Sequence, residues 1–193
     1  MKFIGYYNYT VILTYISLFS GVLGIGCAAN EKIGLSILCL MFSGFCDMFD
    51  GAIARTKKDR TDDEKNFGIQ LDSLCDVICF GVLPAVILYF SGVRTVVGII
   101  ILLCYVLCGL IRLAFFNVLE TKRQMTEDGC AKGYRGLPIT MASVIYPLFY
   151  LIGLALPSSV MVIVYHILPA ILALLFISDI HIPKIDITKI FKR

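Results

Sequence analysis

Residues 33–54 read IGLSILCLMFSGFCDMFDGAIA, an apolar run that carries two aspartates near its end. A helix needs about 20 apolar residues to cross the ~30 Å hydrocarbon core of a bilayer, and this run is long enough. Asp47 and Asp50 are its unusual members, because a charged side chain at the centre of a membrane helix costs ~2.5 to 3.5 kcal/mol on insertion scales. The run therefore predicts a transmembrane helix whose acids serve a function.

Apolar runs of similar length recur along the whole chain. Of its 193 residues, 59% are hydrophobic and 16% are charged, and the mean hydropathy is +0.87. This composition excludes an ordinary soluble domain, a disordered chain and a secreted disulfide scaffold. We expect an all-α polytopic membrane protein that forms a single domain over residues 1–193, with six transmembrane helices at Val11–Ala29, Ile33–Ala54, Phe67–Phe90, Val96–Leu119, Ile139–Leu156 and Ser159–Ile177.

Basic residues gather on one side of these predicted spans, whereas only Lys32 and Arg94 fall in the connections of the other side. Cytoplasmic loops carry the excess of Lys and Arg, so the long polar segments 56–66 and 120–138 are expected in the cytoplasm together with both termini. The protein is thus expected in the cell membrane. Its cytoplasmic side is marked by Lys2, Arg55, Lys57, Lys58, Arg60, Lys65, Lys122, Arg123, Lys132, Arg135, Lys184, Lys189, Lys192 and Arg193.

Acidic residues form matching stripes on two predicted helices. Residues three, four, seven and eight positions apart share one face of a helix. The two stripes consist of Asp47, Asp50, Gly51, Ala54 and Arg55 on the first helix, and of Gly68, Asp72 and Asp76 on the second. One cytoplasmic loop joins these helices, so they run antiparallel and the four carboxylates can face one another.

Four facing carboxylates require a positive counter-charge. Arg55 and Arg112 supply only two cations, so ion pairing alone leaves a surplus of negative charge. Hard divalent cations prefer oxygen ligands, and we therefore expect a pair of Mg²⁺ or Mn²⁺ ions between the stripes. Asp47 follows Ile33 by 14 residues, or ~21 Å at about 1.5 Å per residue. This depth puts the expected site in the cytoplasmic leaflet.

The eight cysteines could suggest a metal site or a disulfide framework. Cys75 and Cys79 lie one helical turn apart, as do Cys104 and Cys108, but no nearby histidine completes a zinc ligand set. We therefore interpret the cysteines within the apolar runs as small packing residues.

The order of the acidic residues resembles a known signature. Asp47-x2-Asp50-Gly51-x2-Ala54-Arg55, followed by Gly68-x3-Asp72-x3-Asp76, resembles the motif of the CDP-alcohol phosphatidyltransferases. One difference is that the segment Thr56–Phe67 between the two halves is longer than is usual in the family and highly charged. The extra residues fall in the cytoplasmic loop, where they need not disturb either stripe.

The flanking sequence is similar to the phosphatidylserine synthase branch of that family. The similar segments are Phe67–Asp76, Phe80–Pro84, Arg112–Asn117 and Tyr134–Pro138. The resemblance implies transfer of the phosphatidyl group of CDP-diacylglycerol to the hydroxyl of L-serine, which yields phosphatidylserine and CMP. It also implies membrane lipids as partners and a homodimer, and it gives no reason to expect nucleic acid.

The resemblance further implies roles for individual residues. Asp47, Asp50, Asp72 and Asp76 would hold the two metal ions, and Asp76 would also be the general base. Asp50, Gly51, Ala54 and Gly68 would bind the nucleotide, and Arg55 would bind phosphate or pair with an acid. Apart from the resemblance, Arg112 is an intramembrane cation that needs a partner, and we expect it to bind the serine carboxylate of the acceptor or a lipid phosphate. Asn117 and Arg135 lie at the same membrane face and are the other candidates for acceptor binding, and snorkelling or a salt bridge to the acids remains an alternative for Arg112.

Two other functions remain open from the sequence. A sister transferase with glycerol 3-phosphate or inositol phosphate as acceptor would need more cationic groups for the additional phosphate. A cation transporter would need polar residues in the extracellular leaflet, and the outer halves of the predicted spans are apolar. An assay of CMP release with each acceptor separates these functions.

Overall fold

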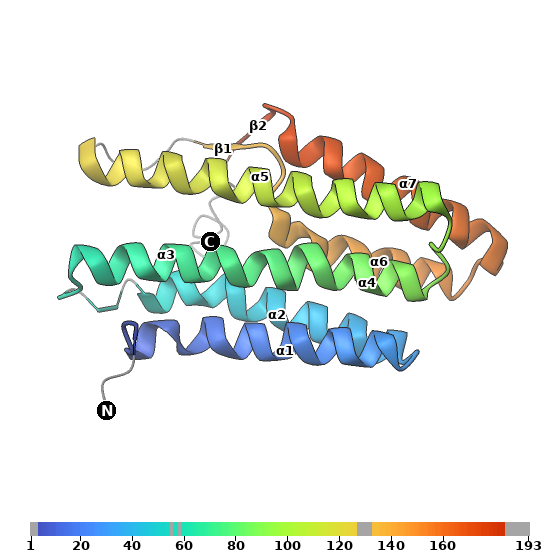
Figure 1. Cartoon of the computed structure of the whole chain (residues 1–193), viewed down its shortest axis with the longest axis horizontal. Helices are drawn as coiled ribbons and strands as arrows, with labels where there is room; N and C mark the ends of the chain where they lie inside the picture. Colours follow the sequence, from blue (N-terminus) through green and yellow to red (C-terminus); the bar gives the residue numbers. More distant parts are fainter. Residues whose placement is uncertain (1–3, 55, 58, 127–132, 184–193) are drawn as a thin grey trace, which may run out of the picture.

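The computed structural model describes residues 4–54, 56–57, 59–126 and 133–183, which form an elongated bundle of helices (Figure 1). A short antiparallel ladder joins Gly133–Arg135 (β1) to His181–Pro183 (β2). The helices, in chain order, are η1 Tyr9–Val11, α1 Ile12–Ala29, α2 Ile33–Ala54, α3 Asp62–Asp76, η2 Val77–Val82, α4 Leu83–Phe90, α5 Val96–Thr126, η3 Ile139–Met141, α6 Ala142–Gly153 and α7 Ser158–Ile177.

Five helical segments of the described chain are long and apolar enough to cross a membrane. They are Tyr9–Ala29, Ile33–Ala54, Asp62–Phe90, Val96–Thr121 and Ser158–Ile177. The predicted helical membrane protein is thereby confirmed, with the small β ladder as an addition. The remaining predicted span forms a shorter apolar helix, Ile139–Gly153, so the count of six spans stays a prediction.

Two helices extend beyond the spans predicted from hydropathy. α3 begins at Asp62, not at Phe67, because Thr61 and Glu64 form a reciprocal capping box at its N-terminus. α5 continues to Thr126, beyond the predicted end at Leu119. Hydropathy marks the part of a helix that lipid can solvate, whereas backbone hydrogen bonds and caps decide where the helix ends. Parts of both long polar segments, predicted as loops, are therefore helical.

The α1–α2 hairpin is held together by small and hydroxylated residues. Ser43 donates a hydrogen bond to the carbonyl of Ser17 at 3.0 Å, and Ser17 donates to the carbonyl of Ser43 at 3.3 Å. Ser36 donates to the carbonyl of Gly24 at 2.8 Å. Small residues allow the helix backbones to approach closely, and hydroxyl groups then bond across the interface, as is common between membrane helices.

A π-helix, η2, interrupts the long helix that runs from Asp62 to Phe90. It begins directly after Asp76 and ends before Leu83, where α4 begins. The buried Tyr105 of α5 donates its hydroxyl to the carbonyl of Phe80 within this π-helix at 2.7 Å. The ring of Tyr105 also packs edge-to-face on Tyr146 at 5.9 Å. The π-helix is thus fixed to the core of the bundle.

Candidate functional site

Three carboxylates from two helices converge in the part of the chain that the structure describes. Asp47 and Asp50 come from the last two turns of α2, and Asp72 comes from α3. One ligand oxygen of each lies within 4.8 Å of the other two. α2 and α3 run in opposite directions (Figure 1), so acids that lie apart in sequence reach the same level. All three residues are partly buried.

Asp76 lies one turn beyond Asp72, at the last position of α3. Only 7% of its surface is exposed, which makes it the most buried of the four acids. It does not belong to the group of three converging ligand atoms. However, residues four positions apart share one face of a helix, so Asp76 follows Asp72 on the same face of α3. The four predicted acids thus form one acidic cluster, with Asp76 at its buried end.

The acidic cluster has no basic partner among the described residues. The ion pairs of that part of the chain join Lys57 to Glu64 and Lys65 to Asp62, both near the start of α3. Crowded carboxylates without a cation repel one another and are costly to bury. A set of converging carboxylate oxygens is the donor chemistry that Mg²⁺ and Mn²⁺ prefer, so these residues fit divalent cations.

The glycine and alanine positions predicted to face the nucleotide lie at the open end of the acidic cluster. Gly51 is exposed and Ala54 partly exposed in the last turn of α2, and Gly68 is partly exposed on α3. A guanidinium nitrogen of Arg60 lies over Gly68, where a Cβ atom would be 2.7 Å from it. Arg55, the predicted phosphate ligand, lies outside the described residues.

The predicted acceptor residues have different surroundings. Asn117 of α5 is buried, accepts a hydrogen bond from Ser73 at 2.9 Å and donates to Gln70 at 3.5 Å. It therefore ties α5 to the α3 turn that carries Asp72. The partly buried guanidinium of Arg112 lies 5.9 Å from the ring centre of Phe116. The side chain of Arg135 lies outside the described part of the chain, although its backbone belongs to β1.

Cys75 and Cys79 lie on the side of α3 and η2 that contacts α1. Both are buried thiols that contact α1, where Cys75 donates to the carbonyl of Thr14 and Cys79 to that of Ser17, each at 3.4 Å. Their sulfurs lie 3.8 Å apart without a disulfide. A Cβ at Gly21 would lie 2.6 Å from the Cys79 sulfur, so a glycine is needed for this close approach. The cysteines pack α3 and η2 against α1, as small packing residues are expected to do.

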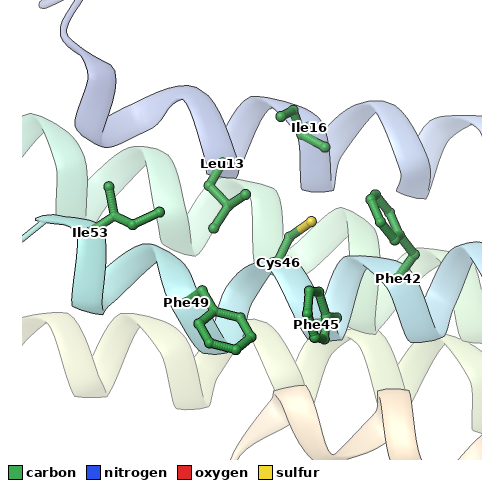
Figure 2. Close-up of a pocket in the computed structure, with 7 residues that line it drawn as sticks. All are labelled: Leu13, Ile16, Phe42, Phe45, Cys46, Phe49 and Ile53. Carbon is green, nitrogen blue, oxygen red and sulfur yellow. The ribbon is translucent and has the colours of Figure 1, made fainter.

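A separate apolar groove of about 400 Å³ opens between α1 and α2 (Figure 2). The acids are not among its lining residues, and all of its lining side chains are apolar, so it offers no group for proton or phosphate chemistry. The groove is lined by Leu13, Ile16, Phe42, Phe45, Cys46, Phe49 and Ile53.

Sequence reasoning missed two features beside the acids. The sequence predicts Arg60 only as a basic loop residue, because no spacing rule says that a loop side chain folds back over Gly68. The π-helix η2 has no sequence signature either. The start of α3 did have one, since Thr61 and Glu64 stand at the spacing of a capping box.

Comparison with known proteins identifies the family. The CDP-alcohol phosphatidyltransferase family model matches residues 7–179. The chain is 33% identical to an archaetidylserine synthase of Methanothermobacter thermautotrophicus, over 91% of this chain and 69% of the relative. It is 32% identical to a CDP-diacylglycerol–serine O-phosphatidyltransferase of Methanocaldococcus jannaschii, over 90% and 74%. The Bacillus subtilis protein of the same name is 30% identical, over 74% and 79%. No solved structure matches the chain. The chain therefore belongs to the CDP-alcohol phosphatidyltransferase family of enzymes.

Proposed function

We propose that this protein transfers the phosphatidyl group of CDP-diacylglycerol to the hydroxyl of L-serine and releases CMP. The convergence of Asp47, Asp50 and Asp72 within 4.8 Å, on the two helices of the family motif, is the observation that carries this proposal. The names of three similar proteins favour serine as the acceptor, since one is an archaetidylserine synthase and two are CDP-diacylglycerol–serine O-phosphatidyltransferases.

The carboxylates of Asp47, Asp50, Asp72 and Asp76 would hold two divalent cations, Mg²⁺ or Mn²⁺. When bound, these ions neutralise the diphosphate of the donor and polarise the phosphorus under attack. Two observations support this assignment of divalent cations. The converging ligand atoms are all carboxylate oxygens, and the four acids have no basic partner among the described residues.

Asp76 is the proposed general base, because it is the most buried acid and stands apart from the converging group of three. Its carboxylate would accept the proton of the serine hydroxyl. The serine oxygen then forms a bond to the phosphorus that carries the lipid. The bond from this phosphorus to the CMP oxygen breaks, and CMP leaves with the electron pair.

The nucleotide would lie against the small residues at the open end of the acidic cluster. Gly51, Ala54 and Gly68 present little side chain there, which allows a flat ligand to approach the backbone. Asp50 would contribute to this nucleotide site as well as to the metal site. Arg55 would contact phosphate, since a guanidinium can offer a phosphate two parallel hydrogen bonds.

Arg112, Asn117 and Arg135 are the proposed acceptor residues. A guanidinium can hold the serine carboxylate with two parallel hydrogen bonds in a site that is otherwise negative. Asn117 would contribute to the acceptor site by holding α5 in place, since its hydrogen bonds to Ser73 and Gln70 join α5 to the helix of Asp72 and Asp76.

We also propose that the site and both termini face the cytoplasm, because the basic residues gather on that side of the spans. An even number of crossings follows, with Ile139–Gly153 as the sixth span. Its 15 residues would reach ~22 Å at about 1.5 Å per residue, so the bilayer would have to thin locally around it. The working unit is proposed to be a homodimer.

The test is CMP release by the purified protein in detergent, with CDP-diacylglycerol and with or without L-serine. We expect release that requires serine and yields phosphatidylserine. Glycerol 3-phosphate and inositol phosphate serve as alternative acceptors, and a CDP-linked isoprenoid lipid serves as an alternative donor. Release that does not depend on serine, or that another acceptor supports better, would contradict the proposed acceptor.

A further inference from the structure

Arg60 connects the two helices that carry the acids. It lies in the short connection between α2 and α3, one position before the Thr61 cap of α3. Its Nη1 donates a hydrogen bond to the carbonyl of Ala54 at 3.4 Å, and its Nη2 donates to the carbonyl of Glu64 at 3.1 Å. One guanidinium therefore bridges the end of α2 and the first turn of α3.

The same guanidinium covers the bare surface of Gly68. A Cβ atom at Gly68 would lie 2.7 Å from Nη2 of Arg60, and the next nearest atom is the guanidinium carbon of Arg60 at 3.9 Å. Arg60 thus occupies the side of α3 on which the nucleotide is proposed to lie. A nucleotide that reaches Gly68 must meet this side chain.

Arg60 also retains its charge and an unused donor. Arg60 forms no ion pair in the described part of the chain, where Glu64 pairs with Lys57 and Asp62 with Lys65. The two acceptors of Arg60 are neutral carbonyls. Its Nε is buried and has no hydrogen-bond partner in the described part of the chain. A buried donor without an acceptor calls for an explanation, and a guanidinium held by carbonyls binds an anion more strongly than it binds them.

We propose that Arg60 is a binding residue for the diphosphate of the donor. In the free enzyme it rests on Gly68, and when the donor binds it exchanges the two carbonyls for the anionic diphosphate of a cytidine diphosphate lipid. This inference rests on the proposed function and adds a residue outside the family motif.

The test compares Arg60→Ala, Arg60→Gln and Arg94→Ala in steady-state kinetics with both substrates, together with CDP binding measured by calorimetry. Loss of a charge-assisted contact should raise the KM for CDP-diacylglycerol and the Kd for CDP by about 10-fold or more. The KM for serine should change by less than about 2-fold, because Arg60 does not touch the acceptor in this proposal. Arg94→Ala should match the parent, since Arg94 lies at the other end of the spans over the rings of Tyr89 and Phe90.

Arg60→Gln separates this role from a purely structural one. Its amide can still donate to a backbone carbonyl but carries no charge, so the thermal midpoint should stay near that of the parent while nucleotide affinity falls. Unchanged CDP affinity in a folded Arg60→Gln protein would overturn the inference and leave the proposed function intact. Conversely, the parent protein could fail to transfer to serine while both Arg60 variants bind CDP more weakly than it does. That result would support the inference and contradict the proposed acceptor.

Discussion

The first and last turns of α3 are both acidic, but their carboxylates have different partners. In the first turn, Glu64 accepts hydrogen bonds from Lys57 and from the backbone of Thr61, each at 3.0 Å. Asp63 accepts from Tyr6 at 3.4 Å, and the charge of Asp63 is the main reason that the pKa of Tyr6 is raised. Each carboxylate of this turn thus has a donor.

In the last turn, the neighbours of the acids are other acids. Asp72 converges with Asp47 and Asp50, and Asp76 is buried beside them. No basic side chain pairs with this cluster among the described residues. The comparison separates acids that stabilise a helix end from acids that cost stability and are kept for binding. The predictions below test this difference.

The largest effect is expected from removal of divalent cations or of a converging carboxylate. Excess chelator, Asp47→Ala and Asp72→Ala should each reduce turnover to background, because the cluster then lacks either its cations or a ligand. In the parent protein, Mg²⁺ or Mn²⁺ at about 100 times its Kd should add ~2.7 kcal/mol of stability. The measurement is CMP release, together with thermal unfolding with and without metal.

Asp62→Asn is the matched control, since it removes an exposed acid from the first turn of the same helix. It should keep both the turnover and the stabilisation by metal. Full activity in excess chelator, with absence of metal verified by elemental analysis, would contradict the proposed metal site.

The next effect concerns Asp76. Asp76→Asn keeps the shape of the side chain and removes its basicity, so kcat should fall by about 10² to 10⁴. Affinity for CDP-diacylglycerol should change far less. Rates are measured at saturating substrates, and binding by calorimetry. A variant that turns over near the parent rate would assign the base to another group.

A smaller effect is expected from Arg112→Lys. Lysine cannot reproduce the planar pair of hydrogen bonds that a guanidinium offers a carboxylate. The KM for serine should therefore rise by about 10 to 150-fold, with less effect on the KM for CDP-diacylglycerol. A steady-state matrix of both substrates measures this. If only the lipid KM changed, Arg112 would belong to phosphate binding and not to the acceptor.

The smallest effect should come from the capped end of α3. Thr61→Ala removes the side chain that accepts from the Glu64 backbone at 3.2 Å. The free energy of unfolding should fall by about 1 kcal/mol. Because the acids of the first turn are structural in this comparison, kcat should stay near that of the parent. Thermal unfolding measures the loss of stability, and CMP release on the same preparation measures kcat. A large loss of kcat in a stable protein would contradict a purely structural role for the first turn of α3.

The convergence of the acids could be predicted because it depends on spacing alone. Asp47 and Asp50 share one helix face, Asp72 and Asp76 share another, and the loop between them makes the helices antiparallel. The helical bundle followed from hydropathy in the same way. Individual rotamers do not follow from spacing, so neither the separation of Asp76 from the group of three nor the position of Arg60 over Gly68 was predictable.

Hydropathy misplaced the helix ends for a physical reason. Asp62, Asp63 and Glu64 are polar, and a membrane-span criterion rejects them, but negative residues favour the N-terminus of a helix. The last turns of α5 are likewise polar and helical. For Ile139–Gly153 the length of the apolar helix is intermediate, so hydropathy alone cannot decide whether it crosses the bilayer.

The π-helix η2 sets the rotational phase between the two halves of one long helix. Each residue of an α-helix advances the side chain by about 100°, and a π-helical segment accommodates one residue more than an α-helix would over the same path. Asp72 can thereby point toward the acids of α2, while Leu83 and Leu88 beyond η2 are buried in the core. A single-residue deletion within Val77–Val82 that restored the α-helix would turn the acids by roughly one such step relative to the core. The length of this segment therefore sets the direction of the acids relative to the buried side chains of α4.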